Sequence, residues 1–352
     1  MEDMERLKFW KGKKVLVTGH TGFKGAWLTA WLNNLKADVA GFSLEKYPND
    51  LLYNSTGVSS RINDARGNIQ DYAKLKSVFD RHKPQVVFHL AAQSLVRKSY
   101  DIPLETVRSN ALGTANLLEC IRLSDSVKCA VVITSDKCYR NNEWVWGYRE
   151  DDAVGGYDPY SCSKGCAELL VDSYRKSFLK KQSKLVASAR AGNVIGGGDF
   201  AQDRLIPDCV KALMKKQRIM IRNPNSTRPW QHVLEPLDGY LTLAERMWRE
   251  KKHDEAWNFG PHMDSIRPVS EVVRMFVDKW GEGRWYKAST ADRKHEARSL
   301  ALDISKAYFT LGWRPKLSLD EAVSLTVEWY KNYQKSDVYD LCINQIERYE
   351  QK

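Results

Sequence analysis

A glycine-rich turn near the N-terminus constrains the fold of this chain more than any other feature. Residues 13–18 (KKVLVT) form a short apolar run, and Gly19, Gly22 and Gly25 follow it directly. The next residues, AWLTAWLNNL, carry an apolar stripe at helical spacing. Glycines let the backbone bend sharply and approach a pyrophosphate, whose negative charge the N-terminus of the next helix favours. The pattern therefore predicts a dinucleotide-binding strand, turn and helix, although its first gap is one residue longer than in the commonest fingerprint.

The rest of the first half alternates between apolar runs and amphipathic segments. Apolar runs at residues 38–44, 85–92, 128–135 and 185–193 predict strands, and residues 102–124 and 158–181 predict helices. Unbroken apolar strands are typical of a parallel sheet that is covered on both faces. The expected fold class is therefore α/β, a doubly wound Rossmann-type parallel sheet, followed by a smaller, mixed C-terminal lobe. His89 lies inside an apolar run, so we interpret it as a core histidine.

Composition excludes several classes of protein. The chain has 352 residues, 43% of them hydrophobic, yet it contains no apolar run long enough to span a membrane. The charged N-terminus lacks a signal core, so we expect a cytoplasmic protein. Seven cysteines without a Cys-x-x-Cys pair argue against a disulfide framework and a metal site, and we interpret Cys162 and Cys166 as packing residues. The net charge is +11, but the Lys and Arg residues are scattered among acidic residues, which argues against nucleic-acid binding.

Acid/base side chains gather where one predicted strand ends and one predicted helix begins. The strand that starts at residue 128 ends in the polar residues Thr134, Ser135, Asp136 and Lys137. Tyr160 and Lys164 follow on a predicted helix, where residues four apart lie on the same face. A tyrosine hydroxyl and a lysine ammonium can therefore approach one point in space, which indicates proton-transfer chemistry.

Several motifs carry a resemblance to a known family. TGHTGFKG, the HLAAQ strand end and Tyr160-Ser-Cys-Ser-Lys164 resemble the extended short-chain dehydrogenase/reductase superfamily. ITSDKCY, EWVWGYRE, RAGNVIGGGD, DRLIPD and RPWQHVLEPL further resemble the CDP-glucose 4,6-dehydratase family, in a match that runs from about residue 9 to residue 333. The resemblance implies a dehydratase that binds NAD and CDP-glucose or a similar nucleotide sugar. It would serve deoxysugar and surface-polysaccharide biosynthesis.

The resemblance also implies roles for the strand-end residues. Tyr160 would remove the C4 hydroxyl proton while a hydride goes to NAD, with Lys164 lowering the pKa of Tyr160 and Ser135 bonding the C4 oxygen. Thr134 is the less favoured hydroxyl. Asp136 would be the acid and Lys137 the base that eliminate water across C5 and C6, which requires a protonated Asp136 and a neutral Lys137. Alternatively, Lys137 merely pairs with Asp136.

A cofactor pocket for NAD is implied around the glycine turn. The second strand ends in Phe42, Ser43 and Leu44, where many NAD-binding folds place a carboxylate, and Glu45 lies just beyond. No arginine follows to favour a ribose phosphate, although Lys46 keeps NADP open. The expected contacts, besides Tyr160 and Lys164, are Gly19, His20, Thr21, Gly22, Phe23, Lys24, Gly25, Ser43, Asn68, Ile69, Leu90, Ala91 and Ala92.

A nucleotide-sugar pocket is implied by the arginines of the second half, because a guanidinium forms paired contacts with phosphate oxygens. We expect one of the arginines in this region to form a structural ion pair instead. His232 is the weaker of the polar candidates. The expected substrate contacts are Gln93, Asn193, Arg204, Leu205, Arg228, His232 and Arg298.

Domain limits and assembly follow from the same resemblance. We expect an NAD-binding Rossmann domain at residues 8–193, with residues 231–260 returning to it. Residues 194–230 and 261–335 would form the nucleotide-sugar-binding lobe, and residues 336–352 a polar tail. The two helices at residues 102–124 and 158–181 would pair in a homodimer or a dimer of dimers.

Other functions compete with the dehydratase. A nucleotide-sugar 4-epimerase or reductase would share the fold and the Tyr-Lys pair without requiring Asp136 and Lys137. A dehydratase for a different nucleotide sugar would retain all of these residues. A non-enzymatic nucleic-acid-binding protein would leave the glycine turn and the Tyr-Lys pair unexplained.

Overall fold

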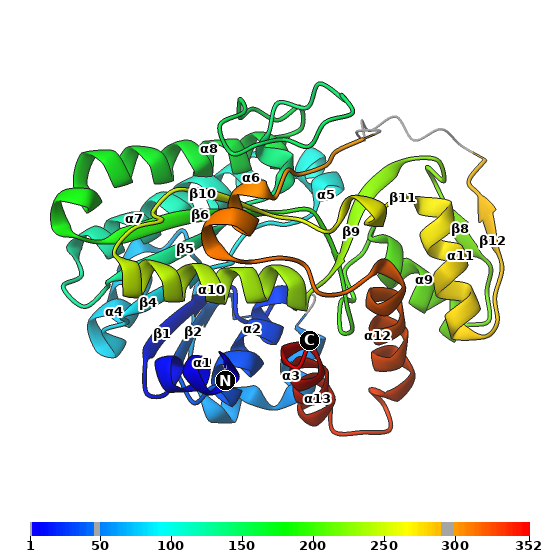
Figure 1. Cartoon of the computed structure of the whole chain (residues 1–352), viewed down its shortest axis with the longest axis horizontal. Coiled ribbons are helices and arrows are strands. Elements are labelled where there is room, and N and C mark those ends of the chain that lie inside the picture. Colours follow the sequence, from blue (N-terminus) through cyan, green and yellow to red (C-terminus); the bar gives the residue numbers. More distant parts are fainter. Residues whose placement is uncertain (1, 46–49, 290–298) are drawn as a thin grey trace.

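A seven-stranded parallel sheet forms the centre of the larger lobe (Figure 1). The computed structural model describes residues 2–45, 50–289 and 299–352. The strand order β10-β6-β5-β4-β1-β2-β3 places β1 between β4 and β2, where the winding direction reverses. The predicted doubly wound α/β fold is therefore confirmed. The strands are β1 (Lys14–Thr18), β2 (Asp38–Ser43), β3 (Asn63–Arg66), β4 (Val86–His89), β5 (Cys129–Ile133), β6 (Leu185–Ala191) and β10 (Ala256–Phe259).

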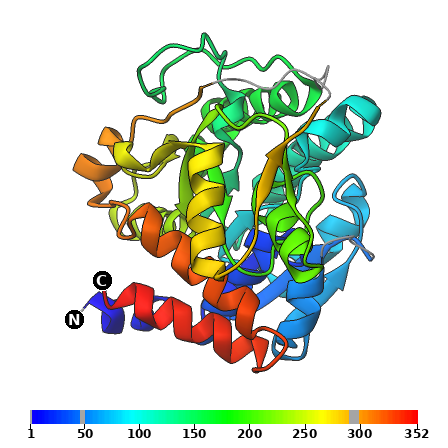
Figure 2. The same cartoon turned by 90° about the vertical axis from the view of Figure 1, so that its right-hand side faces the viewer.

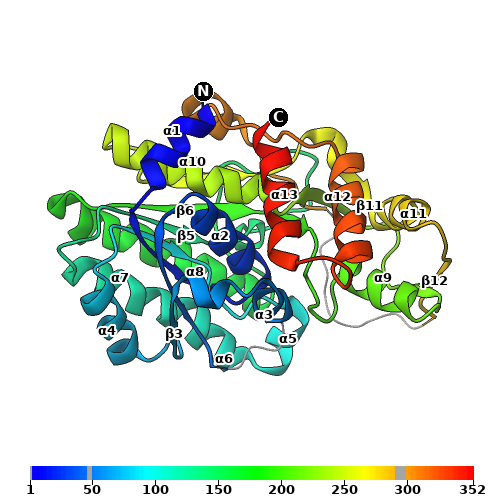
Figure 3. The ribbon, with the colours of Figure 1, turned by 90° about the horizontal axis from the view of Figure 1, so that it is seen from below.

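Helices cover both faces of this sheet, because alternate strand residues point to opposite sides. Val15 and Val17 pack in one apolar cluster with α2 (Phe23–Asn34) and α10 (Leu234–Glu250), whereas Leu16 packs in the other. The second cluster contains residues of α4 (Tyr72–His82), α7 (Gly113–Leu123) and α8 (Pro159–Tyr174), on the opposite side of the sheet (Figure 3). The shorter helices of this lobe are α1 (Glu2–Trp10), α3 (Leu51–Thr56), α5 (Val96–Asp101) and α6 (Pro103–Val107).

Short π and 3-10 segments interrupt or extend these helices. The helix predicted over residues 102–124 consists of α6, the π segment η2 (Arg108–Leu112) and α7, and α8 continues into η4 (Arg175–Leu179) and η5 (Lys180–Gln182). The remaining segments are η1 (Val58–Arg61), η3 (Asp136–Cys138), η6 (Met263–Ser265) and η7 (Ala307–Leu311). Within the described ranges, none of the helices is long and apolar enough to cross a membrane.

A smaller lobe follows β6 and lies at the right of Figure 1; Figure 2 shows it face-on. Strand β9 pairs in parallel with β7 and antiparallel with β11, and β8 pairs with β12. The strands are β7 (Asn193–Ile195), β8 (Ile219–Ile221), β9 (Thr227–His232), β11 (Ile266–Pro268) and β12 (Trp285–Lys287). The helices are α9 (Leu205–Met214), α11 (Val269–Trp280) and α12 (Leu319–Asn332).

The chain crosses between the lobes more than once. After β9 it returns to the larger lobe, where α10 packs on the sheet and β10 pairs with β6. It crosses back a second time after β12. Leu300 and Leu302 then pack beside Tyr148, and the Lys306 Nζ donates to Glu255 at 2.6 Å. Part of the region expected in the nucleotide-sugar-binding lobe therefore lies against the larger lobe.

The C-terminal segment forms a docked helix, so the prediction of a polar tail at residues 336–352 is wrong. Helix α13 (Val338–Glu350) packs against α2, α3 and α12. Cys342 and Ile346 are buried in the main core, and the Gln345 amide donates to the Leu325 carbonyl at 2.9 Å. The helix therefore belongs to the folded core.

Candidate active site

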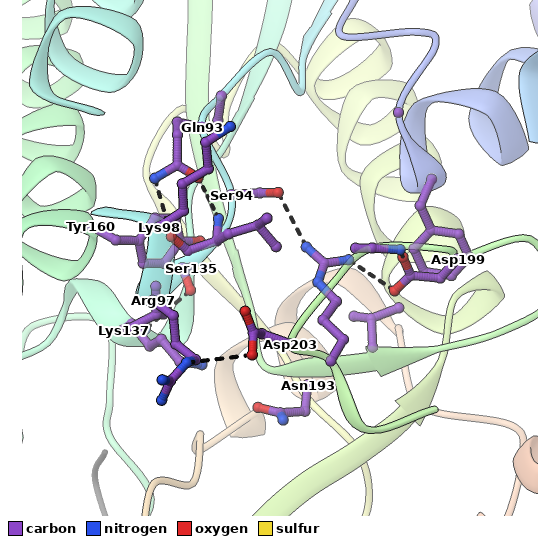
Figure 4. A pocket seen from close by; sticks show the side chains of 18 of the residues that line it. Gln93, Ser94, Arg97, Lys98, Ser135, Lys137, Tyr160, Asn193, Asp199 and Asp203 are labelled. Carbon is purple, nitrogen blue, oxygen red and sulfur yellow. Dashed lines mark hydrogen bonds and ion pairs between the residues drawn. The ribbon is translucent and has the colours of Figure 1, made fainter. Parts of the chain in front are cut away.

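A cavity of about 900 Å³ lies at the carboxyl ends of β1, β4 and β5 and extends into the smaller lobe. Ligands bind at this edge of doubly wound sheets, where the winding direction reverses. Figure 4 shows side chains from both lobes around it. The predicted site residues that line it are Gly19, Gly22, Phe23, Lys24, Gly25, Ser43, Asn68, Ile69, Leu90, Ala91, Ala92, Gln93, Ser135, Asp136, Lys137, Tyr160, Lys164, Asn193, Arg204, Leu205 and Arg228.

The glycine turn is built for close backbone approach. Gly19 has φ +73°, a left-handed conformation that favours glycine. A Cβ on Gly25 would lie 2.0 Å from the Gly19 carbonyl oxygen, so no side chain fits there. Helix α2 begins directly after Gly22 and directs its free N–H groups at the turn. These residues fit a dinucleotide pyrophosphate, which needs close backbone and a helix N-terminus.

Two residues of the turn point away from the cavity. The His20 ring is buried and its Nε2 lies 2.9 Å from an Asp64 carboxylate oxygen, while Thr21 bonds the Ser43 hydroxyl at 2.7 Å. Neither residue lines the cavity. Both residues were expected to contact the cofactor, and their side chains are instead engaged within the protein. Lys46, which kept NADP open, lies outside the described residues.

Asp136 and Lys137 lie at the carboxyl end of β5 in the 3-10 segment η3. The Ser135 hydroxyl donates to Asp136 Oδ1 at 2.9 Å, and the Lys137 Nζ lies 3.4 Å from the same oxygen. Asp136 Oδ2 is buried and has no hydrogen-bond partner among the described residues. The Lys137 side chain is 31% exposed. The ion pair that the alternative interpretation expected is therefore present, and one carboxylate oxygen is left for a ligand.

Tyr160 and Lys164 lie on the first turns of α8, which begins at Pro159 behind the N-cap Asp158. Both side chains are buried. Burial lowers the pKa of Lys164 to about 8, and its ammonium donates to the Ile133 carbonyl at 3.1 Å. Burial also raises the pKa of Tyr160 to about 12, although a hydrogen bond with Ser135 acts in the opposite direction. The protein without ligand therefore does not show the expected lowering of the tyrosine pKa.

A buried network that the sequence analysis missed holds Thr134. Its hydroxyl donates to Glu168 of α8, which also accepts from Ser188 at 2.6 Å and from Arg190 at 2.8 Å. This network joins β5, β6 and α8 beneath the site. It engages the Thr134 hydroxyl, whereas the Ser135 hydroxyl lies beside Asp136 and Tyr160. The charged residues Glu168 and Arg190 lie within otherwise apolar elements, and this pattern in the sequence could have indicated a buried ion pair.

Lys24 brings a third lysine close to Lys137 and Lys164. The sequence assigned it to the cofactor turn, but its side chain is partly buried at the cavity wall. Burial lowers the pKa of Lys24 to about 7, and the nearby positive charges of Lys164, Arg204 and Lys137 act in the same direction. An ammonium in this position loses its proton more readily than an exposed lysine.

The predicted substrate residues differ in the hydrogen bonds that their side chains form within the protein. Arg204 joins the lobes, since its guanidinium bonds Asp199 at 2.9 Å and the Ser94 hydroxyl at 3.1 Å (Figure 4). The Gln93 amide bonds Thr106 and the backbone of Leu95, so it braces the strand-end loop. The Asn193 Oδ1 is buried without a hydrogen-bond partner among the described residues.

Among the predicted substrate residues that the structure describes, one is not at the cavity wall. His232 is completely buried, its ring lies edge-on to Trp27, and it does not line the cavity, so its prediction as a substrate contact is wrong. His232 ends β9 inside the core, whereas Arg228 lies at the partly buried start of the strand, at the cavity wall. Arg298 lies outside the described residues.

Several polar residues at the cavity wall were not predicted as site residues. Arg97 and Lys98 of α5 line the cavity, as do Asp203 and Arg222 of the smaller lobe. Arg222 bonds Asp203 at 2.8 Å and Arg97 lies 3.4 Å from the same carboxylate (Figure 4). Asp203 therefore links the lobes across the cavity. Its φ of +58° is rare for a non-glycine residue, a feature that sequence does not reveal.

No metal site accompanies these groups in the part of the chain that the structure describes. No cluster of three or more His, Cys, Asp or Glu side chains there could hold a metal ion.

Cys162 is exposed, so its interpretation as a packing residue is wrong, and Cys166 is half-buried.

Comparisons with known proteins show the family and agree with the fold. A family model described as GDP-mannose 4,6 dehydratase matches residues 16–326. A CDP-glucose 4,6-dehydratase from Salmonella typhimurium is 46% identical over 340 residues, covering 95% of each chain. The solved dTDP-glucose 4,6-dehydratase from Bacillus anthracis in complex with NAD has a TM-score of 0.76 at 21% identity, covering 94% of this chain and 99% of that one.

A second solved structure adds a nucleotide sugar to the comparison. MoeE5 in complex with UDP-glucose and NAD has a TM-score of 0.77 at 25% identity, covering 92% of this chain and 100% of that one. The matching family model spans most of the chain, and the curated relative spans nearly all of it. The chain therefore belongs to the GDP-mannose 4,6 dehydratase family of nucleotide-sugar dehydratases, within the short-chain dehydrogenase/reductase superfamily.

Proposed function

We propose that the protein converts CDP-glucose to CDP-4-keto-6-deoxyglucose with NAD that is regenerated within each turnover. The observation that carries this proposal is the second acid/base pair, Asp136 and Lys137, beside Ser135 and Tyr160 in one cavity. An epimerase or reductase needs only the tyrosine and lysine, whereas a dehydration also needs groups for the C5 proton and the C6 hydroxyl. The similarity to the Salmonella CDP-glucose 4,6-dehydratase supports the substrate.

NAD would lie with its pyrophosphate on the glycine turn and its adenosine beside Ser43, Asn68 and Ile69. Bound NAD supplies a hydride acceptor for C4 and a hydride donor for C6. The nearby Arg66 guanidinium already bonds Asp64 at 2.7 Å and the Leu44 carbonyl at 3.3 Å, so it is engaged with the protein instead of being open to the 2′-phosphate of NADP. Both solved relatives described above hold NAD.

The first proton transfer is assigned to Tyr160. Its hydroxyl would take the C4 hydroxyl proton, and Ser135 would hold the C4 oxygen by a hydrogen bond. A phenol with a pKa of about 12 is a poor base at neutral pH, so the positive nicotinamide ring and Lys164 must lower it when the site is filled. The lysine pKa of about 8 keeps most Lys164 ammonium groups charged at pH 7.

The elimination is assigned to the strand-end pair. Asp136 would protonate the departing C6 hydroxyl through Oδ2, the oxygen without a partner in the described structure. Lys137 would remove the C5 proton, which the 4-keto group acidifies. The 3.4 Å ion pair describes the resting state, with an ammonium on Lys137 and a carboxylate on Asp136. One proton must pass from the ammonium to the carboxylate before the elimination, which makes Lys137 the base and Asp136 the acid.

We also propose a cytoplasmic homodimer or dimer of dimers. Helices α6 and α8 pack side by side and expose Leu104 and Leu169, which are 60% and 61% exposed. The seven cysteines are all free thiols, as in proteins of reducing compartments. Sedimentation velocity measures the assembly directly: we expect a species of at least twice 40.5 kDa, and a monomer would contradict the proposal.

The function is tested by incubating the protein with NAD and CDP-glucose and analysing the product by NMR and mass spectrometry. We expect a 4-keto-6-deoxy sugar without net NADH. Parallel reactions with UDP-, dTDP- and GDP-linked sugars test the substrate, with CDP-glucose giving the highest kcat/KM. Formation of CDP-galactose, or of stoichiometric NADH, would contradict the dehydratase assignment.

A further inference from the structure

The end of the cavity inside the smaller lobe is enclosed by α9 and β8. Leu205, Asp208 and Lys211 are spaced three residues apart on α9, so they share one face, and all three line the cavity. Met220 and Arg222, from β8 and the residue after it, line the cavity too, and α9 packs against β8. If NAD fills the opposite end, as the proposed function requires, this end is left for the nucleotide part of the substrate.

Among the described residues, three carboxylates line this part of the cavity, and two of them are already engaged. Asp199 accepts from Arg204 at 2.9 Å and from the Ala201 N–H at 3.1 Å. Asp203 is held by Arg222 and Arg97. The Asp208 carboxylate forms no hydrogen bond or ion pair with any residue that the structure describes.

The Asp208 side chain is half-buried, so its carboxylate loses part of its hydration without gaining a partner among the described residues. Burial raises its pKa, and the nearby positive charges of Lys211 and Arg222 oppose that effect without reaching ion-pair contact. A partly desolvated carboxylate gains from any N–H donor that a ligand brings. The feature therefore favours a ligand that presents a donor at this position.

The pyrimidine bases differ in what they present there. Cytosine carries a 4-amino group, which donates, whereas uracil and thymine carry a 4-carbonyl, which accepts. An ionised carboxylate only accepts hydrogen bonds, so it pairs with the amino group and repels the carbonyl. We propose that Asp208 accepts a hydrogen bond from the 4-amino group of cytosine and thereby selects CDP-linked over UDP- and dTDP-linked sugars. This inference rests on the proposed function for the placement of the base.

Asp208→Asn tests the assignment, because the amide is isosteric and presents both a donor and an acceptor. CDP and UDP are titrated calorimetrically into the protein with NAD present. We expect the wild-type preference for CDP over UDP to fall about tenfold or more in Asp208→Asn, the range of one good base contact. Asp203→Asn is the matched control: it removes a carboxylate from the same end and should weaken both nucleotides by similar factors.

The two variants and the product assay separate this inference from the proposed reaction. Three results would overturn the role of Asp208. The preference for CDP over UDP could be unchanged in Asp208→Asn, it could fall equally in Asp203→Asn, or it could be absent from the wild-type protein. If Asp208→Asn loses the preference but wild type forms no 4-keto-6-deoxy sugar, the base contact stands and the reaction fails. If the product forms but the preference survives Asp208→Asn, the reaction stands and the base contact fails.

Discussion

At the residue scale, the chemistry depends on which groups share the carboxyl end of β5. Tyr160 and Lys164 serve any hydride transfer at a carbinol carbon. In the proposed reaction, Asp136 and Lys137 extend that chemistry to elimination. Asp136 has one oxygen without a partner among the described residues, and Lys137 is 31% exposed. Lys137 forms an ion pair in the resting protein, so its proposed role as a base is the assignment most open to test.

Lys137→Met should stop the elimination and spare cofactor binding. The variant lacks the base for the C5 proton, so we expect no solvent deuterium at C5 of the sugar and wild-type affinity for NAD. Lys98→Met is the matched control, because Lys98 also lines the cavity but lies on α5. Full deuterium incorporation in Lys137→Met, measured by NMR of the product, would exclude Lys137 as the base.

Glu235 predicts a pH dependence of stability that is independent of catalysis. The carboxyl is buried, accepts from the Leu317 N–H at 2.6 Å and from the Tyr349 hydroxyl at 2.7 Å, and burial raises its pKa from 4.5 to about 7. Between pH 4.5 and about 7, the Glu235 carboxyl stays protonated in the native state, whereas in the unfolded chain it loses its proton. Stability from Glu235 is therefore full below pH 4.5 and is lost as pH rises to about 7.

The expected loss for this group is about 3 kcal/mol over that interval, at 1.36 kcal/mol per pKa unit. Glu235→Gln removes the titration and keeps most of the shape. In chemical unfolding between pH 5 and 8, the variant should gain stability relative to wild type as the pH rises. Parallel pH profiles for the two proteins would show that Glu235 does not carry the effect.

Individual side chains were predictable where local spacing fixes their neighbours. Tyr160 and Lys164 lie four apart on one helix, so sequence alone placed them together. His232 was not predictable, because its burial depends on Trp27 of a distant helix. Asp203 and Arg97 meet across two lobes, and no local pattern connects residues that far apart.

At the scale of elements, the glycine turn and the parallel strands were predictable because their patterns are short and self-contained. Strand β3 was not predicted, since its residues NDAR are polar and lie at the sheet edge. Helix α13 was read as a polar tail because its apolar stripe is weak without the partner that buries it. Trp31 of α2 supplies part of that partner, since its indole donates to Glu350 at 2.8 Å.

The docked position of α13 predicts that its apolar face stabilises the whole protein. Ile346 is completely buried, so Ile346→Ala should lower the free energy of unfolding by about 2 to 5 kcal/mol. Glu347→Ala, one residue away on the exposed face, should change it by less than about 0.5 kcal/mol. Equal effects of the two substitutions in chemical denaturation would mean that α13 does not pack as described.

At the scale of the whole molecule, the chain crosses between the two lobes more than once, and residues of both lobes line the cavity. The larger lobe supplies the glycine turn and the acid/base residues, and the smaller lobe supplies Asn193, Asp208 and Arg228. The fold class could be predicted from the sequence, and most predicted site residues that the structure describes line the cavity, whereas many other cavity residues were not predicted. The crossings between lobes could not, because they depend on contacts such as β10 with β6 that no local pattern encodes.

In the proposed reaction, one cavity oxidises C4, eliminates water and returns the same hydride to C6. The most direct test uses CDP-glucose deuterated at C4, a small amount of NAD and NMR of the product. We expect a 4-keto-6-deoxy sugar that carries the deuterium at C6. Deuterium that is retained at C4, lost to solvent or accumulated in reduced cofactor would contradict it.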